Sequence, residues 1–417
     1  MRRVLALPVV ALASALALAG CSTGPHSHAT PQDPTADFGV TRSEITLGAL
    51  TDNSSPFSEV GTGVVQGQQL WIKETNADGG ICRRKITLKV GDYQANAVQA
   101  SAKYSALEPK VLGFTQIAGS SATAALSQRM IDNETTVVAL SKSAELLSNP
   151  YVIIPAATYD VEMINGLSYL MEQGKIHDGD TIGHIWLDGD YGANGLRGAR
   201  YFAQRHHLNL RETKVTTESP MRDVVAAFAA KPRVKSIALS TTPDQAAAAA
   251  AANQEVRLNV PMVGNGPVFT PRLLTGPAAG ALYNLSVLAG SVPFSSAVPK
   301  AQHVAEAYRQ AGYQELPNSG VPYGYAIGRI WGQLLTRACI NGDLSRSGIQ
   351  EALRQLTTIT TDHLVADLNF AKPGSPATRD TAVGVPDPAV PGGIREVKPL
   401  SASPDAQSYI APHQTGD

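Results

Sequence analysis

The chain places small hydroxyl residues and glycines where short apolar runs end, and this repeated pattern carries the clearest chemistry in the sequence. A helix that starts at such a point offers free backbone N–H groups and a positive dipole end to a carboxylate, and serines add hydroxyl donors. Any one of these segments alone is ordinarily a helix N-cap. Several that face one crevice predict a ligand site. The segments are Asp52-Asn53-Ser54-Ser55, Gly119-Ser120-Ser121, Ser141-Lys142-Ser143, Asp188 to Gly192, Ser240-Thr241-Thr242 and Asn265-Gly266.

The motifs of hydrolases, metalloproteases and nucleotide-binding enzymes are missing from this sequence. It has no G-x-S-x-G nucleophile elbow, no H-E-x-x-H and no G-x-x-x-x-G-K-[ST]. Asp188-Gly189-Asp190-Tyr191-Gly192 lacks the later ligands of a calcium loop, so it is interpreted as a strand-to-helix turn. We therefore expect no catalytic residue, no metal and no cofactor.

The elements that position these segments alternate between strands and helices. In the first half, strand patterns precede helical rhythms three times and a fourth strand follows, which predicts a parallel sheet covered by helices on both faces. A second series of the same kind follows, so two similar α/β lobes are expected. The predicted strands are 45–50, 86–90, 111–115 and 136–140, then 181–187, 210–217, 236–240, 261–264 and 283–289.

Later segments are helical, and the last part of the chain is rich in proline and glycine. Helices are predicted over 299–311, 322–340 and 347–356, and these are expected to return to the first lobe. Beyond Pro373 only Ile394 to Leu400 has a strand-like pattern. The alanine run Ala246 to Ala252 follows Thr242-Pro243-Asp244-Gln245, which has the form of a capping box with proline at the first helical position.

The N-terminus has the form of a secretory signal. Met1-Arg2-Arg3 precedes an apolar run from Val4 to Ala19 that is shorter than a membrane-spanning helix. Leu18-Ala19-Gly20-Cys21 resembles the lipobox of bacterial lipoproteins, which implies cleavage before Cys21 and acylation of its thiol. The alternative is an ordinary signal peptide with a chance cysteine. We expect residues 1–20 to be the signal peptide, and 21–43 to be the lipidated cysteine and a flexible tether.

Charge and cysteine content narrow the class of protein further. The 417 residues carry a formal net charge of -1, which favours neither nucleic acid nor an anionic surface. With Cys21 lipidated, Cys82 and Cys339 remain as a pair in an oxidising compartment. A disulfide between them is favoured over two buried thiols. The loop-entropy model predicts that such a crosslink stabilises the fold by about 4–5 kcal/mol. Their spacing excludes a zinc site.

The order of these segments resembles the solute-binding proteins of ABC transporters, of the branched-chain amino-acid (Leu/Ile/Val) binding type. The likeness covers residues 44–370. It rests on Ile45-Thr46-Leu47-Gly48, Asn76-Ala77-Asp78-Gly79-Gly80-Ile81 with Arg84-Lys85-Ile86, Gly119-Ser120-Ser121-Ala122-Thr123, Asp190-Tyr191-Gly192 and Tyr323-Gly324-Tyr325-Ala326.

The resemblance implies an α/β fold of two Rossmann-like lobes with parallel sheets, joined by three hinge crossovers near Pro155, Gly290 and Leu368. The ligand cleft lies between the lobes, which close on the ligand like a hinged trap. The implied ranges are 44–155 with 290–368 for lobe 1, 156–289 with 369–410 for lobe 2, and 411–417 for a tail.

The resemblance also implies the ligand contacts. The loop Gly119 to Ser121 receives a carboxylate, Ser141 gives a backbone contact, Ser143 gives a hydroxyl, and Tyr191 closes over the ligand. Thr242, at a strand end of the second lobe, completes the set. The sequence departs from amino-acid binders at two points, because Asn265 stands at the expected acid and Phe57 or Val60 at a frequent tyrosine. A ligand with a carboxylate or amide, not necessarily a zwitterion, is therefore expected.

The expected function is that of a lipid-anchored extracytoplasmic binding protein, a monomer without catalysis, that captures a small polar ligand such as an amino acid and delivers it to an ABC permease. A ligand sensor on the same fold that reports to a membrane receptor is a second reading. An extracytoplasmic enzyme using the cleft and a structural protein of the cell envelope are further alternatives.

Overall fold

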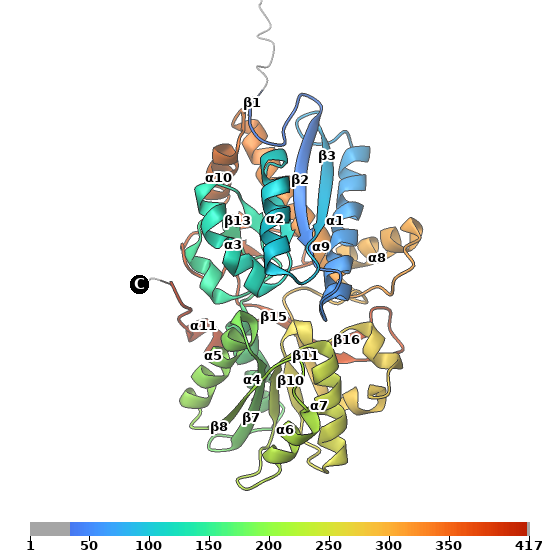
Figure 1. Ribbon diagram of the computed structural model, residues 1–417, viewed down its shortest axis with the longest axis vertical. Coiled ribbons are helices and arrows are strands. Elements are labelled where there is room, and N and C mark those ends of the chain that lie inside the picture. The colour runs from blue at the N-terminus through green and yellow to red at the C-terminus, as the bar shows by residue number, and fades with distance from the viewer. Residues whose placement is uncertain (1–33, 415–417) are drawn as a thin grey trace, which may run out of the picture. The chain divides into compact units, whose positions relative to one another are not determined.

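The computed structural model describes residues 34–414, so the signal sequence and Cys21 lie outside the described residues. Two sheets organise this part of the chain (Figure 1). The first has the strand order β3-β2-β4-β5-β6, all parallel, and the second the order β16-β15-β11-β10-β9-β7-β8. This confirms the predicted α/β fold with mostly parallel sheets in two lobes.

Lobe 1 is the five-stranded sheet with helices on both faces. One face packs against α1, α8, α9 and α10 around a core that includes Trp331 and Leu47, and the other against α2 and α3 around Tyr104 and Phe114. The elements are β2 (Glu44–Thr51), α1 (Ser58–Ala77), β3 (Lys85–Asp92), α2 (Ala97–Leu107), β4 (Phe114–Ile117), α3 (Ser120–Asp132), β5 (Val137–Val138), β6 (Val152–Ile153), α8 (Pro299–Ala311), α9 (Gly320–Ile340) and α10 (Arg346–Gln355).

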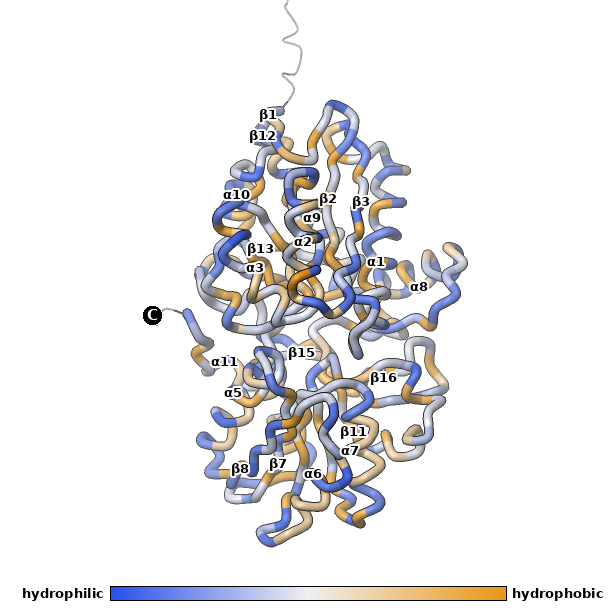
Figure 2. Tube along the Cα trace, viewed as in Figure 1, coloured by the Kyte–Doolittle hydropathy of each residue, from blue (hydrophilic) through white to orange (hydrophobic). Residues whose placement is uncertain are grey.

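Lobe 2 is the seven-stranded sheet, also covered on both faces. Helices α6 and α7 pack on one face, and α4, α5 and α11 on the other. Figure 2 shows hydrophobic residues along the inner strands and hydrophilic residues on the outer helix turns. The elements are α4 (Tyr159–Glu172), β7 (Thr181–Leu187), α5 (Asp190–Arg205), β8 (Asn209–Val215), α6 (Met221–Phe228), β9 (Ile237–Ser240), α7 (Pro243–Glu255), β10 (Met262–Gly264), β11 (Leu285–Ala289), β15 (Thr381–Pro386), β16 (Ile394–Ser401) and α11 (Pro404–Ser408).

The edge of the second sheet differs from the all-parallel prediction. Strand β15 pairs antiparallel with β11, and β16 pairs antiparallel with β15. The prediction of a strand at Ile394 to Leu400 agrees with β16, whereas β15 lies in a stretch expected to be irregular. The chain passes between the sheets after β6, after β11 and between β14 (Leu368–Asn369) and β15.

Residues expected in the tether pack against lobe 1 from Thr35 onward. Strand β1 (Thr35–Ala36) pairs with β12 (Asp343–Leu344), and the guanidinium of Arg346 lies 4.3 Å from the ring centroid of Phe38. Gly39 has a positive φ of 74° and its backbone lies against Val111 and Leu112. The tether predicted to run to residue 43 is therefore held on the lobe over its last residues.

Two predictions from the sequence are confirmed, one of a covalent bond and one of a local helix cap. Cys82 and Cys339 form a disulfide, which ties the turn after α1 to the last turn of α9. Thr242 and Gln245 form the capping box at the start of α7, with Pro243 at the first helical position. Among residues 34–414, no helix has both the length and the apolar character needed to cross a bilayer.

Candidate functional site

A cleft of about 380 Å³ lies between the lobes at the carboxyl ends of both sheets. This is where ligands bind in open α/β sheets, because the helices that follow these strands begin there. Residues of lobe 1 such as Phe57 and Ser120 line it together with residues of lobe 2 such as Tyr191 and Thr242. Backbone at the second crossover, Ala289-Gly290-Ser291, also lines the cleft. A ligand here would touch both lobes and the hinge.

One end of the cleft is built by the start of α3. Its N-cap is Gly119, whose φ of 79° suits glycine, and no side chain caps the helix. The first amide N–H groups of α3 are therefore available to a ligand, at the positive end of the helix dipole. The hydroxyls of Ser120 and Ser141 lie 2.7 Å apart beside this helix start. The arrangement suits a carboxylate oxygen.

Helix α5 begins at the cleft in the same way from the other lobe. Its N-cap is Gly189, with φ of 117° and no side-chain cap, and its first turn carries Asp190 and Tyr191. Burial raises the pKa of the Asp190 carboxyl, with a smaller contribution from Glu145. Two uncapped helix starts thus face the cleft from opposite lobes.

Aromatic rings from both lobes line the cleft, among them Phe57, Tyr159, Tyr191 and Tyr323. The rings of Phe57 and Tyr191 pack edge to face with centroids 6.0 Å apart, and Tyr159 lies 4.8 Å from Tyr191. Burial raises the pKa of Tyr159, Tyr191 and Tyr323 above the ordinary tyrosine value, so their hydroxyls remain protonated donors at neutral pH. The Tyr323 hydroxyl is buried and has no hydrogen-bond partner among the described residues.

A buried ion pair lies beside these rings. Lys142 lines the cleft and its ammonium pairs with Glu162 of α4, whose side chain is 0 % exposed. The second carboxylate oxygen of Glu162 accepts a hydrogen bond from the Asn265 amide at 3.0 Å. The Lys142 Nζ lies 5.1 Å from the ring centroid of Tyr159. A charge pair that is enclosed and hydrogen-bonded in this way is costly to break by removing one partner.

The other end of the cleft is an apolar arm, built mostly from lobe 2. No acidic or basic side chain is among the residues that form it. Such a surface suits the hydrocarbon part of a ligand, because burial of apolar area contributes roughly 25 cal/mol of binding free energy per Å² removed from water. The arm is lined by Pro267, Phe269, Pro271, Val287, Pro293, Ala382, Gly384, Gly392 and Ile394.

The structure brings most of the predicted site residues together and leaves two out. Ser143 and Asn265 do not line the cleft. Asn265 is fully buried behind it, where its amide also donates to the backbone oxygen of Tyr159, and the neighbouring Gly266 lines the cleft instead. The predicted residues that line it are Phe57, Gly119, Ser120, Ser121, Ser141, Tyr191 and Thr242.

Ser143 is buried beside its predicted position. Its backbone N–H donates to the Ser141 hydroxyl at 3.3 Å, and its own hydroxyl has no partner among the described residues. In the short segment after β5, Ser141 and Lys142 line the cleft, whereas Ser143 is buried and does not.

Several lining residues were not predicted. Tyr159 begins α4 after the first crossover, a helix that the sequence analysis did not predict. Tyr323 lies in the segment Tyr323-Gly324-Tyr325-Ala326, on which the family resemblance partly rests, so the sequence marked it as a candidate for the cleft. No pattern in the sequence predicted the apolar arm, because its residues come from distant segments that only the folded sheet brings together. Among residues 34–414, no group of histidine, cysteine, aspartate or glutamate side chains is arranged to hold a metal.

A sequence profile described as "Periplasmic binding protein" matches residues 44–387. None of the curated proteins matches the chain. Among solved structures, one described as a fatty acid ABC transporter substrate-binding protein from Thermomonospora curvata is 33% identical. The alignment covers 92% of this chain and 99% of that one, with a TM-score of 0.88.

Two more distant structures share the fold. A branched chain amino acid ABC transporter protein from Thermus thermophilus with bound valine is 14% identical, with 88% and 99% of the two chains covered and a TM-score of 0.78. A branched-chain amino acid transporter substrate-binding protein from Streptococcus pneumoniae in complex with isoleucine is 17% identical, with 85% and 100% covered and a TM-score of 0.70.

Proposed function

The chain belongs to the periplasmic binding protein family, and from this premise we propose that it captures an acid with an extended apolar body and delivers it to an ABC importer. Members of this family are extracytoplasmic solute-binding proteins. The lobes would close over the ligand by rotation at the crossovers, and the closed form would dock on the membrane permease.

The observation that carries this proposal is the division of the cleft into two chemically different ends. The start of α3, with Ser120 and Ser141, offers donors for a carboxylate. The arm around Phe269, Val287 and Ile394 is lined by apolar side chains. An amino acid with a short side chain would fill the polar end and leave most of the arm in contact with water.

Similarity to the Thermomonospora curvata protein supports the same ligand class. That protein is described as binding fatty acids, and it is considerably more similar in sequence than the two amino-acid-related structures. The initial expectation of a small polar ligand is therefore narrowed to an acid with an alkyl or similarly apolar body.

Attachment to the membrane through Cys21 is part of the proposal. The segment Leu18-Ala19-Gly20-Cys21 supports it. Expression of the full chain with a labelled fatty acid should label the protein, and Cys21→Ala should abolish the label and release the protein from the membrane fraction. Label retained on the Cys21→Ala variant would rule out this site of lipidation.

The ligand class is tested by calorimetry on residues 34–417 with aliphatic monoacids of increasing length, leucine, isoleucine, valine and the corresponding primary amides. We expect affinity to rise with chain length among the acids, by about 0.8 kcal/mol per buried CH₂ group. X-ray scattering should report closure on binding. Tight binding of leucine or valine without binding of octanoate or longer acids would contradict the proposed ligand.

A further inference from the structure

Lys142 places a largely buried positive charge at the cleft, beside the start of α3. It directly follows Ser141, whose hydroxyl contacts that of Ser120 at the start of α3. Its side chain is 10 % exposed and lines the cleft. The Nζ would be 3.6 Å from a Cβ atom built on Gly266, so the ammonium reaches across to lobe 2.

Both carboxylate oxygens of Glu162, the fully buried acid beside the cleft, already have partners. One carboxylate oxygen pairs with Lys142, and the other accepts from the Asn265 amide at 3.0 Å. The Asn265 carbonyl oxygen in turn accepts from the Ser240 hydroxyl at 2.7 Å, which fixes the orientation of the amide. The negative charge that would attract a ligand ammonium is therefore already neutralised by Lys142.

The Lys142 ammonium keeps donors for a ligand. An ammonium has three N–H groups, and one is directed to Glu162. Tyr159 connects this ammonium to the carboxylate end, since its ring is 5.1 Å from Nζ and its hydroxyl interacts with Ser120. A carbon next to a carboxylate held by α3 would consequently lie close to Lys142.

Three further acids line the cleft, Asp52, Asp188 and Asp190. Asp52 accepts hydrogen bonds from the backbone N–H groups of Ser54 and Ala95, at 3.2 and 2.8 Å. Asp188 is exposed and lies 3.5 Å from Lys214. Asp190 is in the first turn of α5, across the cleft from Lys142. Glu162 is the acid that would lose its partner if Lys142 lost its charge.

We infer that Lys142 is a specificity-determining residue that selects acids without an α-amino group and rejects the matching amino acids. This inference rests on the proposed function. A ligand ammonium would meet the like charge of Lys142, and Glu162 beside it is already paired, whereas a carboxylate would gain a charged donor. The charge of Lys142 would reject amino acids whatever the size of their side chain.

The test compares two ligands that differ only in the amino group, octanoate and 2-aminooctanoate, by calorimetry. We expect the wild-type protein to prefer octanoate by tenfold or more, on the scale of one charge-assisted hydrogen bond. Lys142→Met keeps the length of the side chain and removes the charge. It should lower octanoate affinity and raise that of 2-aminooctanoate, because Glu162 becomes free to accept the ammonium.

Two further variants keep the test decisive. Lys142→Met with Glu162→Gln leaves no buried unpaired charge, so it should fold even where the single variant does not, and it should reduce the preference to about threefold or less. Lys214→Met removes a positive charge outside the cleft lining and should keep the wild-type preference.

The outcomes separate this inference from the proposed function. If the wild type binds octanoate and the double variant keeps the full wild-type preference, the inference is overturned and the proposed function stands. If the wild type prefers 2-aminooctanoate, the inference is overturned as well. If the wild type binds neither octanoate nor longer acids, the proposed ligand class fails, and with it the role of Lys142.

Discussion

The ring of Phe57 meets the ring of Tyr191 edge to face, with centroids 6.0 Å apart. Phe57 is the N-cap of α1 in lobe 1, and Tyr191 lies in the first turn of α5 in lobe 2. Tyr191 also packs edge to face against Tyr159, with ring centroids 4.8 Å apart. These rings join the two lobes across the cleft, so a ligand held by α3 would be enclosed by them.

Truncation of this aromatic bridge should weaken ligand binding. Tyr191→Ala is expected to raise the dissociation constant for an aliphatic acid about 10- to 100-fold, because a buried ring contributes roughly 1.5–3 kcal/mol. Tyr191→Phe should have little effect, since the hydroxyl makes only a 3.4 Å contact with the Thr241 carbonyl oxygen. Calorimetry measures both. Tyr201→Ala, which removes a ring packed edge to face on Tyr409 and outside the cleft lining, is the matched control.

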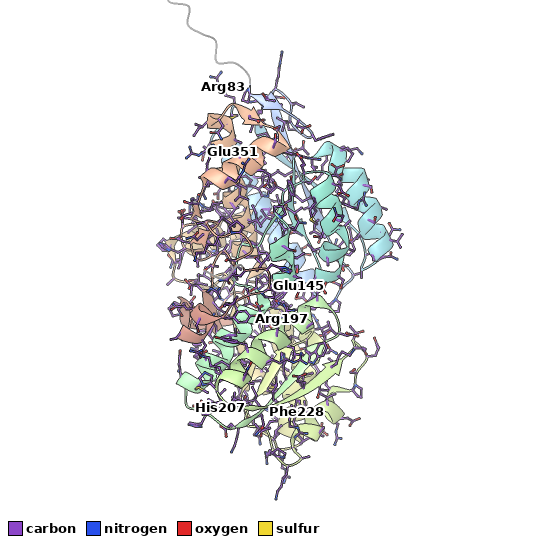
Figure 3. All side chains as sticks on the ribbon, turned by 90° about the vertical axis from the view of Figure 1, so that its left-hand side faces the viewer. Arg83, Glu145, Arg197, His207, Phe228 and Glu351 are labelled. Atoms are coloured by element: carbon purple, nitrogen blue, oxygen red, sulfur yellow. A yellow bond between two sulfur atoms is a disulfide. The ribbon has the colours of Figure 1, made fainter. Side chains whose placement is uncertain are left out.

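A second contact between the lobes is ionic. Arg272, after β10 in lobe 2, donates to Glu59 of α1 at 2.7 Å and to Asp244 of α7 at 2.9 Å. Arg197 of α5 similarly pairs with Glu145 at 2.5 Å, and Figure 3 labels these two residues near the junction of the lobes. Both pairs bridge the lobes outside the ligand site, so they are expected to favour the closed form.

Removal of the Arg272 bridge should speed ligand release. Arg272→Ala is expected to raise the dissociation rate by about two- to fivefold, because the pair is largely exposed and such pairs contribute 0.2–1 kcal/mol. The effect should disappear in about 1 M salt, where the screening length falls to about 3 Å. Stopped-flow displacement measures it. Arg222→Ala breaks an exposed pair with Glu255 within lobe 2 and should leave the rate unchanged.

The fold was predictable where its signals are local. Runs of β-branched residues and capped helices are properties of neighbouring residues, so both lobes and the capping box at Thr242 were found. Strand β15 was missed because Gly384 and Pro386 lie within it, and both residues are depleted in strands. Strand β15 is stabilised by antiparallel pairing with β11, which is distant in sequence, and with β16, which follows it.

The site, like the fold, was predictable where its residues adjoin a local helix signal. Gly119 and Ser120 precede an evident helix, so their position at the cleft followed from the sequence. Asn265 was misplaced by one residue, since the short turn after β10 directs Gly266 and Pro267 to the cleft and the amide into the core. The apolar arm depends on residues such as Phe269 and Ile394, which only the assembled sheet brings together.

The disulfide should stabilise the fold without affecting the ligand. Cys82 and Cys339 are separated by 257 residues, and the loop-entropy relation gives such a crosslink about 5 kcal/mol. Cys82→Ser with Cys339→Ser should therefore lower the free energy of unfolding by several kcal/mol in urea. Ligand affinity should persist, because α1 begins at the cleft and the disulfide lies after its far end. An unchanged urea midpoint would contradict this prediction.

A buried histidine connects stability to pH. His184 on β7 is 0 % exposed, and its Nε2 lies 3.1 Å from the Ser240 hydroxyl. Ser240 donates its own proton to Asn265, so His184 Nε2 carries the hydrogen and Nδ1 does not. Nδ1 has no partner among the described residues. Protonation would place an unsatisfied donor and a charge in the core, and burial lowers the pKa of His184 to about 3.

This lowered pKa should make the protein less stable as the pH falls below about 6.5. Between that value and about pH 3 the unfolded chain binds a proton at His184 that the folded protein does not, so stability rises with pH in this window. The contribution approaches 1.4 kcal/mol per pH unit, or about 2 kcal/mol between pH 7 and pH 5. His184→Gln should remove this part of the slope in urea denaturation at the two pH values. The exposed His177→Gln variant should keep the wild-type slope, and an equal slope for His184→Gln and wild type would show that His184 is not the group responsible.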